Sequence, residues 1–360
     1  MTELVAQPNL LIEALSYLGR KANGNTWEHM EERLRERRIP ASAAFTRALA
    51  LLKKVTAHLD RLEAVQRADL TPFQNLEGSA HNTVGTGSPA FLLLYGTLED
   101  YHGDTAVYLQ QVCTLPPEKV AYHMALALDL ADDYPHQALT DWELLELILS
   151  TALPDSSKIT ILNTYRNYAA LLAQLSGPLE AVIGALSQEA EALAALSQVL
   201  TEKVRAEGCA QYLSRTSRLT LSEAQDYRLR PYLFGMDTCL TSDESAGVVQ
   251  VYCGILRDEL LTMLSGQTPA QEAVYDAYKL LGDRTRFDIL CYLRGRSAYG
   301  QELSAHFGLS RNTIHHHMNK LLSYGLVRCT TVGNRVYYST DARAIQLLLD
   351  RQKELFSDEA

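Results

Sequence analysis

Residues 308–323, which read GLSRNTIHHHMNKLLS, decide the fold of the C-terminal part of the chain. Gly308 is typical of a tight turn that ends a helix, and Ser310 is typical of the N-cap of the next one. We therefore expect a short helix over residues 300–307 and a second over residues 311–323. Two helices joined by a short turn with glycine form a helix-turn-helix, whose second helix is presented outward.

The residues that follow predict a hairpin. Residues 326–330 and 335–340 read as strands, and the four residues between them, TVGN, are typical of a tight connection. A helix-turn-helix followed by such a hairpin is a winged helix. Helices over residues 273–281 and 284–293 are expected before it. A last helix begins near Asp341, and its apolar stripe consists of Ile345, Leu348 and Leu349.

Helical geometry ranks the residues of the 311–323 helix, because each residue advances about 100° around the axis. The predicted buried face consists of Ile314, Met318, Leu321 and Leu322. The opposite side holds Asn312, His316 and Asn319. Thr313 and Lys320 lie on one flank, and His315 lies on the other.

The first turn of this helix is where base edges are usually met, since Arg pairs with guanine and Asn with adenine. Arg311 and Asn312 occupy that turn, although ordinary solvent-exposed side chains would give the same pattern. On the wing, Arg328 and Arg335 are cations placed for a phosphate backbone. Along the second wing strand, 335 and 337 are expected outward, and 336 and 338 inward. The predicted DNA-contacting residues are Ser310, Arg311, Asn312, Thr313, His315, His316, Lys320, Arg328, Arg335 and Tyr337.

The three consecutive histidines at 315–317 are a poor metal site. Neighbouring helical residues diverge by about 100°, so they do not coordinate one ion as an i, i+4 pair does. His317 falls beside the buried stripe and is expected to be a half-buried structural residue, whereas His316 is a candidate DNA contact. We predict no metal site and no cofactor.

These motifs resemble the ArsR-type (ArsR/SmtB) winged-helix regulators. The resemblance is carried by KLLGDRTR at residues 279–286, by LSRNTIHHHMNKL at 309–321 with its paired His316 and His317, and by GNRVYYS at 333–339. It covers about 75 of the 360 residues. It implies a dimeric, sequence-specific DNA-binding transcription regulator, more often a repressor.

The sequence departs from this family where many members bind metals. Residues 297–307 contain no Cys, and residues 342–360 contain no His, so neither familiar metal site of these regulators is implied. Sensing is therefore expected in the long N-terminal region. There, LRPYLF at residues 229–234 resembles a domain that is fused to some ArsR-type regulators.

Charge is distributed unevenly along the chain. The total is −10, but residues 275–360 carry 12 Lys+Arg and 9 Asp+Glu, a net charge of +3, so the rest of the chain carries −13. The acidic total therefore does not argue against DNA binding. We expect the acidic part to be repelled by a duplex while the basic part docks.

Most of residues 8–222 is expected to be helical, because apolar residues recur three or four positions apart. The residue pattern then changes, and about residues 226–256 are typical of a β-hairpin. Cys239 and Cys253 would face each other across it, or are simply two small apolar residues. The sequence thus predicts a mainly α protein with a small hairpin, followed by a C-terminal winged helix-turn-helix.

Residues 265–269, SGQTP, are the expected domain boundary. A helical sensor or dimerisation domain would occupy residues 1–266, and the DNA-binding domain residues 270–360. A sensor would use an apolar pocket, and a scaffold would use long helices such as residues 178–207. An enzyme has little support, because no catalytic motif is found and the polar cluster at residues 100–104 is typical of a turn.

The compartment follows from what the sequence lacks. No apolar run is long enough to span a bilayer, no signal-peptide pattern begins the chain, and six scattered cysteines fit a reducing compartment. We predict a cytoplasmic homodimeric regulator, not an enzyme, with an operator duplex and a small-molecule effector as partners. The alternatives are a protein-interaction scaffold whose winged helix does not read DNA, and a regulator fused to an enzyme domain.

Overall fold

The computed structural model of the chain describes residues 2–36, 41–78, 87–128, 130–131, 137–151, 153–216, 226–243, 248–265, 270–309, 311–332 and 335–356. The chain divides into two units, and each is described by itself. Unit 1 comprises Met1–Tyr212 and Asp226–Leu260, and unit 2 comprises Leu213–Gln225 and Leu261–Ala360. The boundary predicted at residues 265–269 falls mostly outside the described residues, and the separate functions assigned to the two parts stay predictions.

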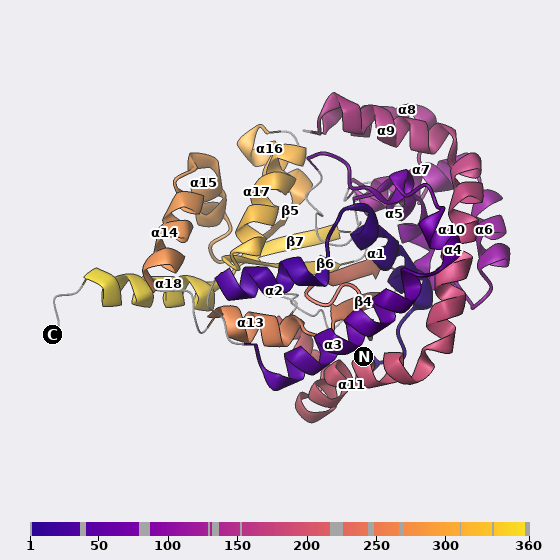
Figure 1. Cartoon of the computed structure of the whole chain (residues 1–360). Coiled ribbons are helices and arrows are strands. Elements are labelled where there is room, and N and C mark those ends of the chain that lie inside the picture. The colour runs from indigo at the N-terminus through magenta and orange to yellow at the C-terminus, as the bar shows by residue number, and fades with distance from the viewer. Residues whose placement is uncertain are drawn as a thin grey trace. The chain divides into compact units, whose positions relative to one another are not determined.

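Helices make up most of unit 1, as predicted for a mainly α protein (Figure 1). The α-helices are α1 (Leu10–Ala22), α2 (Trp27–Glu36), α3 (Ala43–Leu59), α4 (Glu63–Gln66), α5 (Pro89–Leu94), α6 (Thr105–Cys113), α7 (Pro117–Ala127), α8 (Asp141–Ser150), α9 (Asp155–Arg166), α10 (Tyr168–Gln188) and α11 (Ala190–Glu207), with α12 (Cys209–Thr216) and α13 (Arg257–Ser265) crossing into unit 2. Two 3-10 helices are η1 (Thr71–Phe73) and η2 (Tyr95–Asp100).

Side-chain caps set several helix starts. Thr140 and Glu143 form a capping box at α8, in which each side chain accepts the backbone N–H of the other residue. Asp104 accepts a hydrogen bond from the N–H of Val107 at 3.0 Å and begins α6. The polar cluster at residues 100–104 is therefore a turn that starts a helix, as predicted.

Four strands of unit 1 form one mixed sheet in the order β1-β2-β4-β3. They are β1 (Thr2–Leu4), β2 (Asp226–Tyr232), β3 (Cys239–Asp243) and β4 (Val248–Gly254). β1 runs parallel to β2 and β2 runs parallel to β4, whereas β3 pairs with β4 in antiparallel fashion. β4 lies inside the sheet, and successive residues from Val249 to Cys253 are all buried. Burial of consecutive residues shows that both faces of this strand are covered.

The hairpin predicted within residues 226–256 is only part of this sheet. β3 and β4 form the hairpin, and Cys239 is the direct partner of Cys253, without a disulfide. β2 is a separate strand on the other side of β4, because the turn after Tyr232 carries the chain past β4 before β3 begins. β1, which the sequence did not predict, comes from the beginning of the chain.

Helix α1 directs buried polar side chains at the turn after β2. Glu13 is fully buried, and its carboxyl oxygens accept hydrogen bonds from the N–H groups of Leu233 at 2.8 Å and Phe234 at 2.9 Å. Burial raises the pKa of Glu13 to about 8, although the two N–H donors act in the opposite direction. One turn later, the hydroxyl groups of Ser16 and Tyr232 share a hydrogen bond. The turn is thus fixed to α1 by polar contacts that exclude water.

The long helix predicted over residues 178–207 is wrong at its start. Pro178 lies inside α10, and the breaks come instead at Asn167 and Glu189, whose backbones leave helical geometry. A proline inside a helix costs one backbone hydrogen bond, and here packing outweighs that cost, because Pro178 is buried with its helix face. Gly208, with φ at 94°, ends α11.

Within the described part of the chain, α10 is the one helix that is long and apolar enough to cross a membrane by length and composition. Its buried side chains, which include Leu172, Leu175 and Leu179, belong to unit 1, where α10 packs on α1, α5 and α6. The core helix of a folded protein has the same properties, and the packing of α10 is of that kind.

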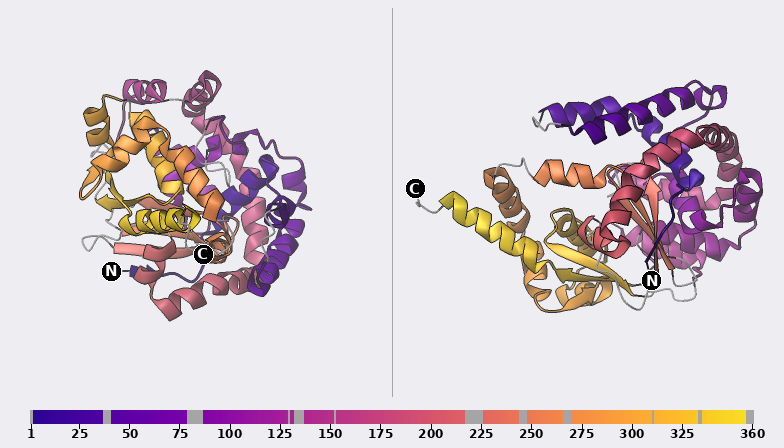
Figure 2. Two further views of the ribbon diagram at one scale, coloured as in Figure 1. Left: turned by 90° about the vertical axis from the view of Figure 1, so that its left-hand side faces the viewer. Right: turned by 90° about the horizontal axis from the view of Figure 1, so that it is seen from below.

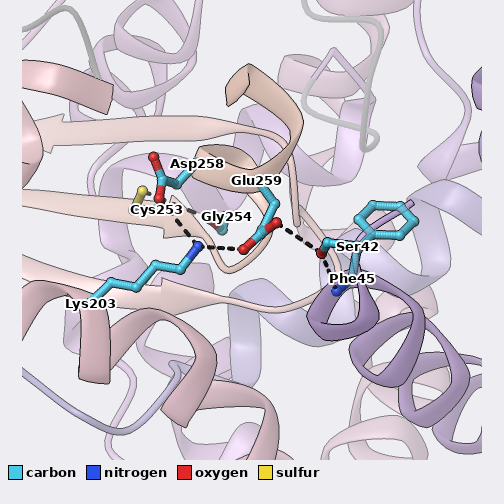
Figure 3. Close-up of polar contacts among 7 residues, drawn as sticks. All are labelled: Ser42, Phe45, Lys203, Cys253, Gly254, Asp258 and Glu259. Atoms are coloured by element: carbon cyan, nitrogen blue, oxygen red, sulfur yellow. Dashed lines mark hydrogen bonds and ion pairs between the residues drawn. The ribbon is translucent and has the colours of Figure 1, made fainter. Parts of the chain in front are cut away.

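A second polar cluster ties α11, α13 and α3 together (Figure 3). Nζ of Lys203 lies 3.2 Å from Oδ2 of Asp258 and 2.9 Å from Oε1 of Glu259. The other oxygen of Glu259 accepts a hydrogen bond from Ser42 Oγ at 2.9 Å, while Ser42 caps α3 by accepting the N–H of Phe45. The lysine and its hydrogen bonds hold the pKa of Glu259 below its usual range.

Unit 2 has the order helix-helix-strand-helix-helix-strand-strand-helix. Its elements are α14 (Ala270–Leu281), α15 (Arg284–Tyr292), β5 (Ser297–Tyr299), α16 (Gly300–Phe307), α17 (Arg311–Ser323), β6 (Val327–Val332), β7 (Arg335–Thr340) and α18 (Ala342–Phe356). The strands form an antiparallel sheet in the order β5-β7-β6. The core includes Ile289, Leu293, Leu303, Ile314, Met318, Leu321 and Val327. This arrangement is the predicted winged helix.

Candidate nucleic-acid interface

The turn between α16 and α17 depends on Gly308 and Ser304. Gly308 has a left-handed backbone, with φ at 64° and ψ at 29°, which glycine adopts more readily than other residues. The N–H groups of Gly308 and Leu309 donate to the carbonyl of Ser304. Oγ of Ser304 in turn donates to the carbonyl of Leu309 at 2.5 Å. These bonds end α16 and direct the chain into α17, so the turn predicted at Gly308 is confirmed.

Helix α17 is anchored by one face. Ile314, Met318 and Leu321 have no exposed surface, and Leu322 packs against the same core. This is the face that helical spacing predicted. Away from this face, Lys320 is exposed.

Among the consecutive histidines of α17 whose side chains are described, His317 is the buried one. It is 8% exposed, and its Nδ1 lies 3.9 Å from Oδ1 of Asp283. Asp283 also caps α15 by accepting the N–H of Arg286 at 3.0 Å. This N–H, the Arg286 guanidinium and His317 hold the pKa of Asp283 below its usual range. His317 therefore joins α17 to the start of α15, which is the structural role predicted for it.

The predicted DNA-contacting residues of α17 are placed only in part. Thr313 and His315 are half-buried and Lys320 is exposed. Ser310 lies outside the described residues, and so do the side chains of Arg311, Asn312, His316 and Arg335.

The wing is the antiparallel pair β6–β7, and β5 pairs with the other edge of β7. Tyr338 is buried in the core, as the alternation along this strand predicted. Tyr337 is half-buried, and its ring lies against Tyr299 of β5, with centroids 5.4 Å apart. Tyr337 therefore forms part of an aromatic pair across the sheet.

Arg328 is engaged within unit 2. Its Nε donates a hydrogen bond to Oδ2 of Asp341 at 2.6 Å. Asp341 is the residue before α18 and accepts the N–H of Ala344 at 3.0 Å. A DNA phosphate would therefore share Arg328 with Asp341.

Two features of this region were missed from the sequence. β5 has only three residues, too few for an alternating pattern to be recognised, so its Tyr299 was not identified as the partner of Tyr337. Asp283 was not recognised as the partner of His317, because the two are 34 positions apart. A local signal existed for its capping role, since Asp is a preferred N-cap residue. Within the described ranges, no group of three or more His, Cys, Asp or Glu residues is placed to hold a metal ion.

Comparison with known proteins adds the family. Residues 283–328, from the cap of α15 into β6, match the family described as bacterial regulatory protein, arsR family. The chain is also similar to the transcriptional repressor SdpR of Bacillus subtilis (strain 168), with 30% identity over 71 residues, which are 20% of this chain and 79% of that protein. The chain belongs to the ArsR family. The resemblance seen in the sequence is therefore confirmed, and no solved structure matches the chain.

ArsR-family membership makes this protein a DNA-binding regulator, and the match at residues 283–328 locates the helix-turn-helix in unit 2. Unit 1 lies outside that match. What unit 1 does must therefore be argued from its own residues.

Proposed function

We propose that this ArsR-family protein is a sequence-specific transcriptional repressor that binds its operator as a homodimer, with unit 1 as an effector-sensing domain. The DNA-binding assignment rests on one observation. Helix α17 follows the tight turn at Gly308 and is anchored by one buried face. A helix held in this way is suited to lie in a major groove. The repressor role is supported by the similarity to SdpR, a transcriptional repressor.

Base reading is assigned to the start of α17, where Arg311 and Asn312 stand. An arginine there would pair with guanine, and an asparagine with adenine. The wing is assigned to the phosphate backbone. The further proposed contacts, taken from helical and strand spacing, are Ser310, Thr313, His315, His316, Lys320, Arg328, Arg335 and Tyr337.

Dimerisation is assigned to α14 and α18, which pack against each other (Figure 1). No described residue of α18 is fully buried. Large apolar or aromatic side chains are exposed on the two helices, namely Tyr275, Tyr278, Leu347, Leu349 and Phe356. Such a patch is typical of an interaction surface, and a second copy of the chain would cover it across a two-fold axis. The two winged helices would then read two half-sites.

The charge distribution fits the same proposal. The basic C-terminal residues would dock on DNA, while the acidic remainder, with a net charge of −13, is repelled by the duplex. Since its partner is an operator duplex, we place the protein in the cytoplasm.

Selection from a random duplex library, followed by gel shifts over a range of salt concentrations, tests this proposal. We expect a symmetric site and an affinity that falls steeply between about 50 and 200 mM salt, because each phosphate contact releases counterions. A winged helix that serves only protein contacts would enrich no sequence and show no salt-dependent duplex affinity. Sedimentation of the free protein would separately show whether it is a dimer.

A further inference from the structure

Unit 1 contains a cavity of about 420 Å³ among α1, α2, α3 and the turn after β2. α2 and α3, which contribute to its wall, lie side by side and are coloured indigo to violet in Figure 2. The volume is within the range of small-molecule sites. Aromatic residues from three elements line it, namely Tyr17, Trp27 and Phe234.

Most charged groups of the cavity wall are paired with one another. Lys21 lies 2.6 Å from Oδ1 of Asp60, which also accepts the hydroxyl of Tyr17 at 2.8 Å. Lys53 of α3 is paired at 3.3 Å and 2.8 Å with two carboxylates of α2, Glu28 and Glu31. Both lysines are therefore paired with carboxylates, and Lys53 has two carboxylate partners for its single charge.

Arg20 is the exception. It is 7% exposed and lines the cavity, with its guanidinium carbon 3.8 Å from the centre of the Trp27 ring. Within the described part of the chain, its guanidinium makes no hydrogen bond and no ion pair. Burial lowers the pKa of Arg20 to about 10. The negative charge of Asp237 acts in the opposite direction, but Asp237 makes no hydrogen bond to the guanidinium among the described residues. A buried guanidinium without a hydrogen-bonded anion is costly, and within the described residues Arg20 is the cation of this wall that lacks one.

We infer that this cavity binds a small aromatic carboxylate, whose carboxylate pairs with Arg20 and whose ring lies against the packed cluster of Tyr17, Trp27 and Phe234. A guanidinium presents a planar pair of donors that matches a carboxylate. Arg20 is the one lining cation without a bonded carboxylate among the described residues, and the carboxylates of Glu28 and Asp60 lie in the same wall, which favours a singly charged carboxylate over a doubly charged phosphate. The aromatic lining gives the flat apolar body of the ligand its contacts.

This site deepens the sensing role proposed for unit 1, and its regulatory meaning rests on that proposed function. Binding itself is measured on the full chain without DNA. A failure to bind operator DNA would therefore leave the ligand result standing, and a failure to bind the ligand would leave the operator result standing.

The test uses benzoate, 4-hydroxybenzoate and indole-3-acetate as probes, with benzamide and inorganic phosphate for comparison. Calorimetry measures binding to the full chain, and emission of Trp27 in a Trp142→Phe background reports its location. We expect saturable binding of at least one carboxylate, at least tenfold weaker binding of benzamide than of benzoate, and weaker binding of phosphate. Arg20→Gln should weaken carboxylate binding at least tenfold, whereas Arg67→Gln, on an exposed arginine of the same unit, should not change it.

Three outcomes would overturn the inference. They are no binding of any carboxylate up to about 10 mM, equal binding of benzoate and benzamide, and equal carboxylate binding by the Arg20→Gln and unchanged chains. Tighter binding of phosphate than of the carboxylates would assign the site to a different anion. If Arg20→Gln does not fold by circular dichroism, the comparison of benzoate with benzamide on the unchanged chain decides the matter.

Discussion

Nε of Arg328 donates a hydrogen bond to Asp341 at 2.6 Å, and this bond connects the wing strand β6 to the first turn of α18. Asp341 also caps α18 through the N–H of Ala344. One carboxylate therefore connects the strand assigned to DNA with the helix assigned to the dimer. A substitution of Asp341 should therefore affect both β6 and the start of α18.

Asp341→Ala removes the ion pair and the cap together. We expect it to destabilise unit 2 by about 1–2 kcal/mol, mostly through the lost cap, as measured by denaturant unfolding. Asp350→Ala is the matched control, because the Asp350 carboxylate is exposed on α18 and accepts a hydrogen bond from Gln346 of the same helix. An equal loss in both variants would contradict the role given to Asp341.

The same carboxylate should give an acid dependence. Burial alone would raise the pKa of Asp341, but Arg328 and the N–H of Ala344 hold it below its usual value of 3.8. Its contribution to stability is therefore fully present above pH 3.8 and is lost as the pH falls through the lowered pKa. The difference in stability between the unchanged chain and Asp341→Ala should shrink in that acid range.

Arg311→Ala and His316→Ala should weaken binding to the selected operator while leaving the fold intact. Loss of a base contact costs about 1–3 kcal/mol, so we expect roughly 10- to 100-fold weaker binding for Arg311→Ala and a smaller change for His316→Ala. Gel shifts measure affinity, and circular dichroism checks folding. Arg343→Ala, an exposed arginine of α18, controls for the lost charge. Unchanged affinity in both test variants would rule out α17 as the recognition helix.

Lys203→Met should destabilise unit 1. It removes Lys203 from between the neighbouring, mostly buried carboxylates of Asp258 and Glu259, at an expected cost of about 1–3 kcal/mol. Because Lys203 lowers the pKa of Glu259, this stabilisation is present at neutral pH and lost as the pH falls through the lowered pKa. The gap to the unchanged chain should therefore narrow in acid. Lys54→Met, on an exposed lysine, is the control, and a gap independent of pH would contradict the assignment.

Glu13 should give unit 1 a pH dependence of the opposite sign. Burial raises its pKa from an ordinary value of 4.5 to about 8 in the folded chain, so its contribution to stability is fully present below pH 4.5 and is lost as the pH rises through 8. We expect a loss on the order of a few kcal/mol across that window. Denaturant unfolding at several pH values measures it. Glu13→Gln should flatten the dependence and Glu146→Gln should not, and a slope that survives Glu13→Gln would show that another group titrates.

The part of the fold that could be predicted from the sequence is local. The buried face of α17 follows from the 3.6-residue period, because Ile314, Met318 and Leu321 return to the same side of one helix. The turn at Gly308 follows from the backbone freedom of glycine. Neither needs information from elsewhere in the chain.

The features that were missed depend on distant residues. Pro178 stays inside α10 because its neighbours bury that helix face, which outweighs the local tendency of proline to break a helix. The lack of a bonded carboxylate at Arg20 cannot be read from a sequence, since it depends on which carboxylates the folded chain brings near. His317 was correctly assigned a structural role from its place on the helix, but its partner Asp283 was not.

The pairing of β1 with β2 has a consequence for biosynthesis. Thr2–Leu4 leave the ribosome long before the strand that they pair with, because that strand is made only after residue 225. The sheet of unit 1 therefore cannot close until translation has passed Gly254, and for most of its synthesis the nascent chain must keep its first strand unpaired. A premature stop anywhere before β4 would leave β1 and α1 exposed to chaperones and proteases, however well the other helices of unit 1 had formed.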